Sequence, residues 1–263
     1  MTTFDSDWLT LREAYDHAAR NTKVLERVGL WAQAYDRLQV VDLGAGTGST
    51  LRAVAPVLGS GQSWRLIEHD PSLIEAGEAR LADTACTWRY ERLNLRDDLE
   101  AAIDDAQIVT ASALVDLVSA EWLEELAALV DRRNCALYVA LSYDGRMRWR
   151  PGVPFDVEIK SLFDRHQQND KGIGSPALGP GAARTLEAHF GDAGVIGRSD
   201  WRLRPIDRPI QTALLRGHAS AASEIAADRS REIEDWRIRR QLWIDTGRSM
   251  ALVGHRDFLK LPG

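Results

Sequence analysis

The 263-residue sequence is poor in the features that mark a secreted, membrane or metal-binding protein. It has two cysteines, Cys86 and Cys135, whose wide spacing favours neither a metal site nor a disulfide framework. No uncharged apolar run nears the roughly 18 residues of a membrane-spanning helix, and the N-terminus has no basic region followed by an apolar stretch. The net charge of −6 is not that of a dedicated polyanion binder. We therefore expect a cytoplasmic, globular protein with no metal site and no membrane contact.

Residues 40–50 are the most informative segment, because they are typical of a buried strand that runs into a glycine-rich turn: Val-Val-Asp-Leu-Gly-Ala-Gly-Thr-Gly-Ser-Thr. Such a turn brings the main chain close to a ligand. A dinucleotide fingerprint would place its third glycine at Ser49, and no Gly-Lys-Ser/Thr follows as in a P-loop. Asp42 is an acid inside an apolar run, which indicates that it holds the loop or a cationic group of a ligand.

A second acid follows at the distance where nucleotide-binding sheets carry a ribose-binding carboxylate, about 20 residues on. Trp64–Ile67 is expected to form a strand, and Glu68 follows it directly. A carboxylate there can accept hydrogen bonds from both ribose hydroxyls. Asp70 precedes Pro71 and is well placed as a helix N-cap, so Glu68 is preferred for the ribose.

The segment from Asp42 to Gly48 resembles the first motif of the class I S-adenosylmethionine-dependent methyltransferases, which is an acid, an apolar residue and Gly-x-Gly-x-Gly after the first strand. The resemblance covers about residues 40–142. It implies a Rossmann-like α/β fold with a doubly wound, mostly parallel seven-stranded sheet, and S-adenosyl-L-methionine as the cofactor. The cofactor-binding residues that it implies are Asp42, Gly44, Ala45, Gly46, Gly48, Glu68, His69, Asn94 and Ser112. Asn94 is equally well explained as a turn residue after a strand.

Alternating strand-like and helix-like segments at 38–142 indicate a parallel sheet with crossover helices. Three further strands are expected at 85–92, 107–112 and 135–141, with a helix capped by Ser119 before the last of them. Residues 1–37 are expected to form a helical segment over the cofactor site, and 38–263 the main domain. Its later parts are predicted as a lid at about 143–180 with irregular residues 146–151 and a helix at 156–168, a helix at 181–193, a helical insertion at about 207–247 with a helix at 225–244, and a terminal hairpin of strands at 194–204 and 249–259.

The candidate proton acceptors are His166, Asp116 and Tyr143. Methyl transfer from a sulfonium is an in-line displacement, so a base is needed only where the acceptor is a hydroxyl or a protonated amine. Each candidate also has a structural explanation: Asp116 can be a solvent-facing loop acid, and His166 a histidine that ends a helix. Arg229 and Arg240 are expected on an apolar helix face, where a structural ion pair is favoured over anion binding.

The sequence favours a small-molecule methyl acceptor, methylated on oxygen or nitrogen. One alternative is an RNA methyltransferase that uses two arginine clusters on phosphates: Arg146, Arg148 and Arg150, and Arg198, Arg202, Arg204 and Arg208. The absence of an Asn/Asp-Pro-Pro-aromatic motif after the fourth strand disfavours methylation of a base amino group. The other alternative is a non-catalytic protein that binds S-adenosylmethionine.

Overall fold

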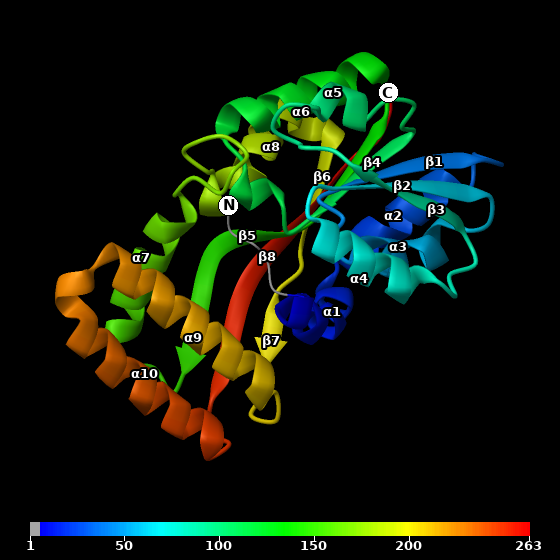
Figure 1. The fold of residues 1–263 in the computed structure, drawn as a ribbon. Coiled ribbons are helices and arrows are strands. Elements are labelled where there is room, and N and C mark those ends of the chain that lie inside the picture. The colour runs from blue at the N-terminus through cyan, green and yellow to red at the C-terminus, as the bar shows by residue number, and fades with distance from the viewer. Residues whose placement is uncertain (1–5) are drawn as a thin grey trace.

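The computed structural model describes residues 6–263 and is built around one twisted sheet (Figure 1). The strand order is β3-β2-β1-β4-β5-β8-β6, and β7 also pairs with β8. The strands are β1 (Leu38–Leu43), β2 (Gln62–Glu68), β3 (Thr87–Arg92), β4 (Ile108–Ser112), β5 (Ala136–Arg150), β6 (Gly194–Arg198), β7 (Trp201–Leu203) and β8 (Met250–Lys260). The first five are parallel, and β8 is antiparallel to its neighbours β5, β6 and β7. The expected α/β fold with a mostly parallel sheet is confirmed.

Helices cover both faces of the parallel part of the sheet. Successive side chains of a strand point to opposite faces, so Val40 packs in one core and Val41 in the other. One face is covered by α2 (Thr22–Ala32), α3 (Ser49–Leu58) and α4 (Pro71–Leu81), and the other by α5 (Leu99–Ala102), α6 (Ala120–Arg133) and α8 (Ala182–Phe190). Ser119 caps α6 by accepting a hydrogen bond from the backbone N–H of Trp122, as its position predicts.

The strand expected at 194–204 is present in two pieces. β6 pairs with the end of β8 and β7 with its beginning, and the two pieces are separated by Ser199 and Asp200. They occupy one position at the edge of the sheet, so the eight strands fill seven positions. The terminal hairpin with the last strand is confirmed.

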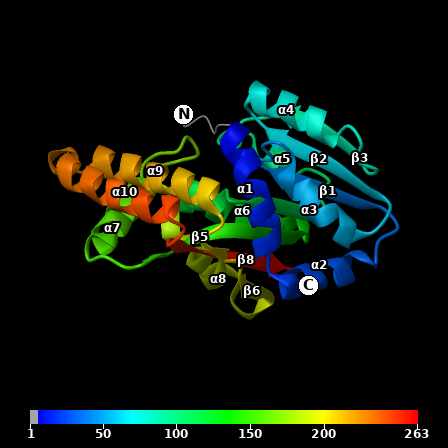
Figure 2. The ribbon, with the colours of Figure 1, turned by 90° about the horizontal axis from the view of Figure 1, so that it is seen from below.

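The lower halves of β5 and β8 extend beyond the rest of the sheet and carry three helices: α7 (Phe155–Gln167), α9 (Arg208–Ile225) and α10 (Ser230–Asp245). We call this part the second lobe; Figure 2 shows it to one side of the β1–β4 half. Residues 146–150 were expected to be irregular, and this is wrong, because β5 continues to Arg150. Met147 and Trp149 are buried while Arg148 and Arg150 are exposed, which is the alternation of a strand with one covered face.

The predicted helix at 225–244 is also wrong in its first part. The helix α9 ends at Ile225, Ala226 leaves the helical conformation with φ −136° and ψ 66°, and α10 begins only at Ser230. The two helices α9 and α10 lie within the range expected for a helical insertion. They form an antiparallel pair in the second lobe.

Two helices precede the sheet, α1 (Ser6–Ala19) and α2, and α1 crosses the carboxyl ends of the parallel strands. Asn21 begins α2 by accepting a hydrogen bond from the backbone N–H of Val24. Residues 1–5 of the segment expected over the cofactor site lie outside the described residues. Within residues 6–263, no helix has the length and apolar character to cross a bilayer.

Candidate functional site

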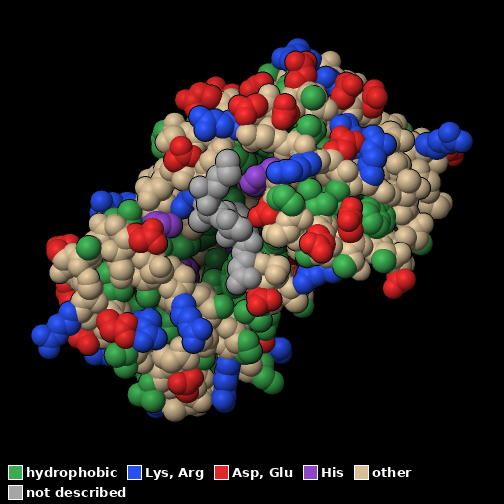
Figure 3. All heavy atoms as spheres, viewed as in Figure 1, with side chains coloured by type: hydrophobic (Ala, Val, Ile, Leu, Met, Phe, Trp, Pro, Cys, Tyr) green, Lys and Arg blue, Asp and Glu red, His purple; other side chains and the backbone are tan. Residues whose placement is uncertain are grey.

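A cavity of about 430 Å³ lies at the carboxyl ends of β1, β2 and β4. The strand order reverses between β1 and β4, and open α/β sheets bind ligands at such a switch point. Figure 3 shows the surface hollowed between the two lobes, with hydrophobic side chains in the hollow. The walls come from the glycine loop after β1, the end of β2, the loop after β3, the end of β4, the helix α1 and residues 171–173.

The glycine loop is held in a backbone conformation that only glycine adopts readily. Gly44, Gly46 and Gly48 have φ values of 63°, 53° and 78°. A Cβ atom at Gly48 would stand 2.7 Å from Cδ1 of Leu81, so both conformation and space require glycine there. Gly44, Ala45 and Gly46 line the cavity, and Gly48 starts α3 behind them.

Glu68 ties the glycine loop to the end of β2. Its side chain accepts hydrogen bonds from the backbone N–H groups of Gly46 (2.9 Å), His69 (2.8 Å) and Asp70 (3.0 Å). The residue is 6% exposed and lines the cavity. Oε2 accepts only one of these bonds, so it keeps a lone pair for a ligand hydroxyl. His69, 57% exposed in its side chain, places Nδ1 3.1 Å from Oε1 of Glu68. Asp70 caps α4, as its position before Pro71 predicts.

Asp42 lies beneath the loop and not on the cavity wall. The residue is fully buried and accepts a hydrogen bond of 2.7 Å from Oγ1 of Thr110. Its other oxygen, Oδ2, has no partner among the described residues. Burial raises the pKa of this carboxyl to about 7, because the charged form loses its water.

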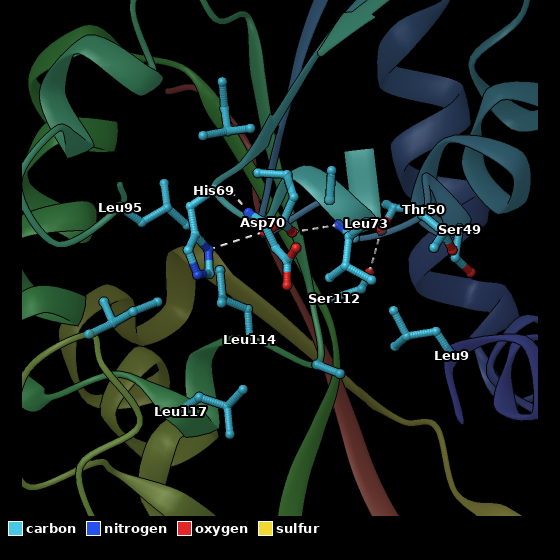
Figure 4. Close-up of a pocket in the computed structure, with 18 of the residues that line it drawn as sticks. Leu9, Ser49, Thr50, His69, Asp70, Leu73, Leu95, Ser112, Leu114 and Leu117 are labelled. Atoms are coloured by element: carbon cyan, nitrogen blue, oxygen red, sulfur yellow. Dashed lines mark hydrogen bonds and ion pairs between the residues drawn. The ribbon is translucent and has the colours of Figure 1, made fainter. Parts of the chain in front are cut away.

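A second polar group of the wall surrounds Ser112 at the end of β4. Its Oγ accepts a hydrogen bond of 3.0 Å from Nη2 of Arg20 and one of 3.1 Å from Oγ1 of Thr50. Arg20 is 4% exposed, and its Nε has no partner among the described residues. Figure 4 shows Thr50 and Ser112 facing each other beside Ser49. From the sequence the role of Arg20 is open between anion binding and a structural ion pair, because its contact with Ser112 joins positions far apart in the chain.

Asn94 lines the cavity between Leu93 and Leu95 and also forms a turn. Its Oδ1 accepts a hydrogen bond of 3.1 Å from the backbone N–H of Arg96. The two explanations offered by the sequence therefore apply to the same side chain. In Figure 4 Leu95 and Leu9 of α1 lie at opposite sides of the view.

The structure places none of the three candidate proton acceptors on the cavity wall. Asp116 comes between two wall residues, Leu114 and Leu117; its Oδ1 is buried without a partner among the described residues, and burial raises its pKa to about 6. The hydroxyl of Tyr143 donates a hydrogen bond of 2.9 Å to Asp164, and burial raises its pKa. His166 instead lies on α7, where its Nε2 is 3.0 Å from Oε2 of Glu224.

The two arginines of the helical insertion form ion pairs within the second lobe. Arg240 is fully buried and pairs with Asp156, and its Nη1 donates a hydrogen bond of 2.5 Å to the carbonyl oxygen of Pro151. Arg229 pairs with Glu158 at 2.8 Å and Glu232 at 2.9 Å. The favoured structural explanation for both arginines is confirmed. Between residues 6 and 263, no group of three or more His, Cys, Asp or Glu side chains is arranged to hold a metal ion.

The arrangement of the sheet decides the fold family. Counting β6 and β7 as one position, the strand order is 3-2-1-4-5-7-6, and the seventh strand is antiparallel. The fold is that of the class I methyltransferases. No protein-family model and no curated protein sequence matches the chain.

Solved structures with this fold do resemble it. A methyltransferase from Geobacter sulfurreducens in complex with S-adenosyl-L-homocysteine is 15% identical, with all of both chains covered and a TM-score of 0.48. A second, from Thiobacillus denitrificans, is 12% identical, with 97% and 99% covered and a TM-score of 0.48. A geranyl diphosphate methyltransferase is 15% identical, with 89% and 76% covered and a TM-score of 0.42. Likeness at this level concerns the fold alone and indicates neither the substrate nor the reaction of this chain.

Proposed function

We propose that the protein is an S-adenosylmethionine-dependent methyltransferase that acts on a small molecule. The observation that carries this proposal is that two complementary groups, a carboxylate and a guanidinium, line the same cavity. Glu68 offers a carboxylate beside a glycine loop, and Arg20 offers a buried guanidinium with an unused Nε–H. The first suits a ribose diol and the second suits an amino-acid carboxylate, which are the two polar ends of this cofactor.

The wall residues divide between the parts of the cofactor. Oε2 of Glu68 would accept a hydrogen bond from a ribose hydroxyl, and Arg20 and Ser112 would bind the carboxylate of the methionine part. His69, Asn94 and Leu95 line the same cavity, and we propose that they enclose the adenine. Asp42 would act through the loop, since it lies beneath it and not on the wall.

When bound, the cofactor supplies a methyl group on a positively charged sulfur. The residues of this chain then have to hold an acceptor in line and keep water out. Asp116 lies behind the wall between Leu114 and Leu117, and it is our candidate for the group that turns toward the acceptor and takes its proton. Its buried Oδ1 has no donor among the described residues, and with a pKa of about 6 it is largely ionised at neutral pH.

The arginine clusters give little support to the RNA alternative. Arg146 is held between Asp144 at 2.5 Å and Asp200 at 2.6 Å. Arg202 lies 3.7 Å from Asp200, so this acid partly neutralises two members of the clusters. Paired arginines offer less net charge to phosphates than free ones do.

Calorimetric titration with S-adenosylhomocysteine tests the cofactor site, with NAD as the dinucleotide control. We expect micromolar binding of the first and none of the second. Labelled S-adenosylmethionine then tests the reaction against a small-molecule cell extract and against total RNA. Label in RNA alone would favour the RNA alternative, binding without any transfer would favour the non-catalytic one, and no binding of S-adenosylhomocysteine would overturn the proposal.

A further inference from the structure

The carboxylates on the cavity wall already have their hydrogen-bond donors. Asp16 of α1 accepts from Nε and Nη2 of Arg12 at 2.7 and 3.2 Å, and from Nε1 of Trp201 at 3.1 Å. Asp70 caps α4, and Glu68 accepts three backbone N–H groups. Apart from the ribose position at Glu68, the wall therefore offers little to a cationic ligand.

Arg12 differs, because it keeps a donor. Its guanidinium is fixed by Asp16 and lies over two tryptophan rings, 5.7 Å from the centroid of Trp8 and 5.1 Å from that of Trp201. Its Nη1 makes no hydrogen bond within residues 6–263. A guanidinium held in this way is pre-organised, so a ligand that binds it need not immobilise it.

Lys171 is the second cation with unused donors. Its Nζ is 3.4 Å from Nδ1 of His166, whose Nε2 is held by Glu224. No carboxylate pairs directly with this ammonium among the described residues, and burial lowers its pKa. Its position is fixed, because the next residues are tied to the start of α6: the N–H of Ser119 donates a 3.0 Å hydrogen bond to the carbonyl oxygen of Ile173.

The charged side chains that line the cavity carry more positive than negative charge. The charged lining residues are the cations Arg12, Arg20, Arg92 and Lys171 and the acids Asp16, Glu68 and Asp70. The lining side chains carry one positive charge in excess, and the carboxylate of Asp116 behind the wall, which interacts with Arg12, offsets it. S-adenosylmethionine then adds one positive charge, because its sulfonium and ammonium outnumber its single carboxylate. Like charges in a partly desolvated cavity repel, and an anionic second ligand would relieve that repulsion.

We propose that the methyl acceptor carries a carboxylate, which Lys171 binds, with Arg12 as a further cation on the wall of the same cavity. This inference rests on the proposed function, in which Arg20 is occupied by the cofactor. Leu9, Leu117 and Ile173 line the same cavity, so the acceptor is expected to combine one carboxylate with a small apolar body. The carboxylate positions the acceptor, and the methyl group goes to another atom.

Ligand-observed NMR on protein saturated with S-adenosylhomocysteine tests this inference with two probes of the same shape, benzoate and benzamide. We expect benzoate to bind about tenfold more tightly, since a hydrogen bond to a charged group is about twice as strong as a neutral one. Lys171→Met should abolish the preference and Lys171→Arg should keep it. The matched control is Lys23→Met, because Lys23 is exposed on α2. Unchanged affinity for S-adenosylhomocysteine shows that each variant is folded.

Equal binding of the two probes, or a preference that survives Lys171→Met, would overturn the inference. Phenyl phosphate is the third probe, and tighter binding of it than of benzoate would also overturn the assignment to a carboxylate. Failure of the proposed function can be distinguished from failure of this inference, because in that case the protein does not bind S-adenosylhomocysteine. The probes are then titrated against the free protein, where the same two outcomes decide.

Discussion

The two sides of the molecule hold their polar groups in different ways. At the strand ends, Glu68 is fixed by three backbone N–H groups and the glycine loop by its own backbone conformation. In the second lobe, side chains fix one another: Arg240 pairs with Asp156, which also accepts a hydrogen bond of 2.8 Å from Nε1 of Trp236. The strand-end side thus keeps donors and acceptors for a ligand, while these charged groups of the second lobe pair with one another.

This contrast predicts that substitutions in the two regions have different consequences. Changes at the strand ends should alter ligand binding, and changes in the second lobe should alter folding. Four substitutions test the contrast.

The largest effect is expected for Arg240→Ala in the second lobe. Removing one partner of a buried ion pair leaves the other charge uncompensated, which costs about 3–5 kcal/mol of unfolding free energy. Urea denaturation measures the loss, and titration with S-adenosylhomocysteine should show unchanged affinity at a temperature where the variant is folded. Arg239→Ala is the matched control, since Arg239 is exposed on the same helix. A large loss of affinity in Arg240→Ala would contradict the division between the regions.

Asp42 should give the strand-end side a pH dependence. Its pKa is raised from 3.8 to about 7, so the unfolded chain ionises first as pH rises. The contribution of Asp42 to the unfolding free energy is therefore largest below about pH 4. It decreases as pH rises to about 7, by at most about 4 kcal/mol. The unfolding free energy of Asp42→Asn, measured from about pH 4 to 8 and compared with that of the wild type, should lack this decline. Parallel pH profiles of the two proteins would show that Asp42 does not titrate in this range.

Glu68→Ala should weaken binding of S-adenosylhomocysteine by about 100-fold. The variant loses the charge-assisted hydrogen bond from Oε2 to the ribose, worth about 1.5–3 kcal/mol, and the contact that fixes the backbone N–H of Gly46. Calorimetry measures the change, and Glu75→Ala on the exposed side of α4 serves as the control. Wild-type affinity in Glu68→Ala would remove Glu68 from the site.

The smallest effect is expected for Gly174→Ala. Gly174 follows Ile173, which is hydrogen-bonded to Ser119 at the start of α6. Gly174 has φ 80°, and a Cβ atom there would overlap the side chain of Ser119. We expect a loss of about 1 kcal/mol of unfolding free energy from the backbone conformation alone. Gly181→Ala is the control, because a Cβ atom at Gly181 meets open space and its φ is −83°. Equal stability of the two variants would mean that the loop is free to move.

The strand-end side was also the more predictable one from sequence. The order of strand, glycine turn, strand and acid is local, so spacing alone placed Gly46 and Glu68 near each other. Arg20 could not be found in this way, because its contact with Ser112 joins residues far apart in the chain. The roles of Asp42, Asn94 and the other predicted cofactor residues stay predictions.

Parts of the second lobe could not be predicted from local sequence patterns. Arg148 and Arg150 alternate with buried residues along β5, but charged residues in such a run are also typical of a loop. The strand can be predicted only when it is known that one of its faces is exposed. The helix break at Ala226 has no proline or glycine that would mark it in the sequence. The contact of His166 with Glu224 depends on how α7 packs against α9, which no spacing in the sequence indicates.

The pairing of β5 with β8 has a mechanical consequence. One two-stranded ribbon runs through both regions without a flexible linker, and its register shifts between Val139 and Ser142 and again between Tyr143 and Met147. Leu141, at the first shift, has φ 58° and lines the cavity. Any change in the angle between the regions has to bend the ribbon at these irregular points, because the ladder is regular on either side. The angle between the two regions is therefore set at two irregular points of a single pair of strands.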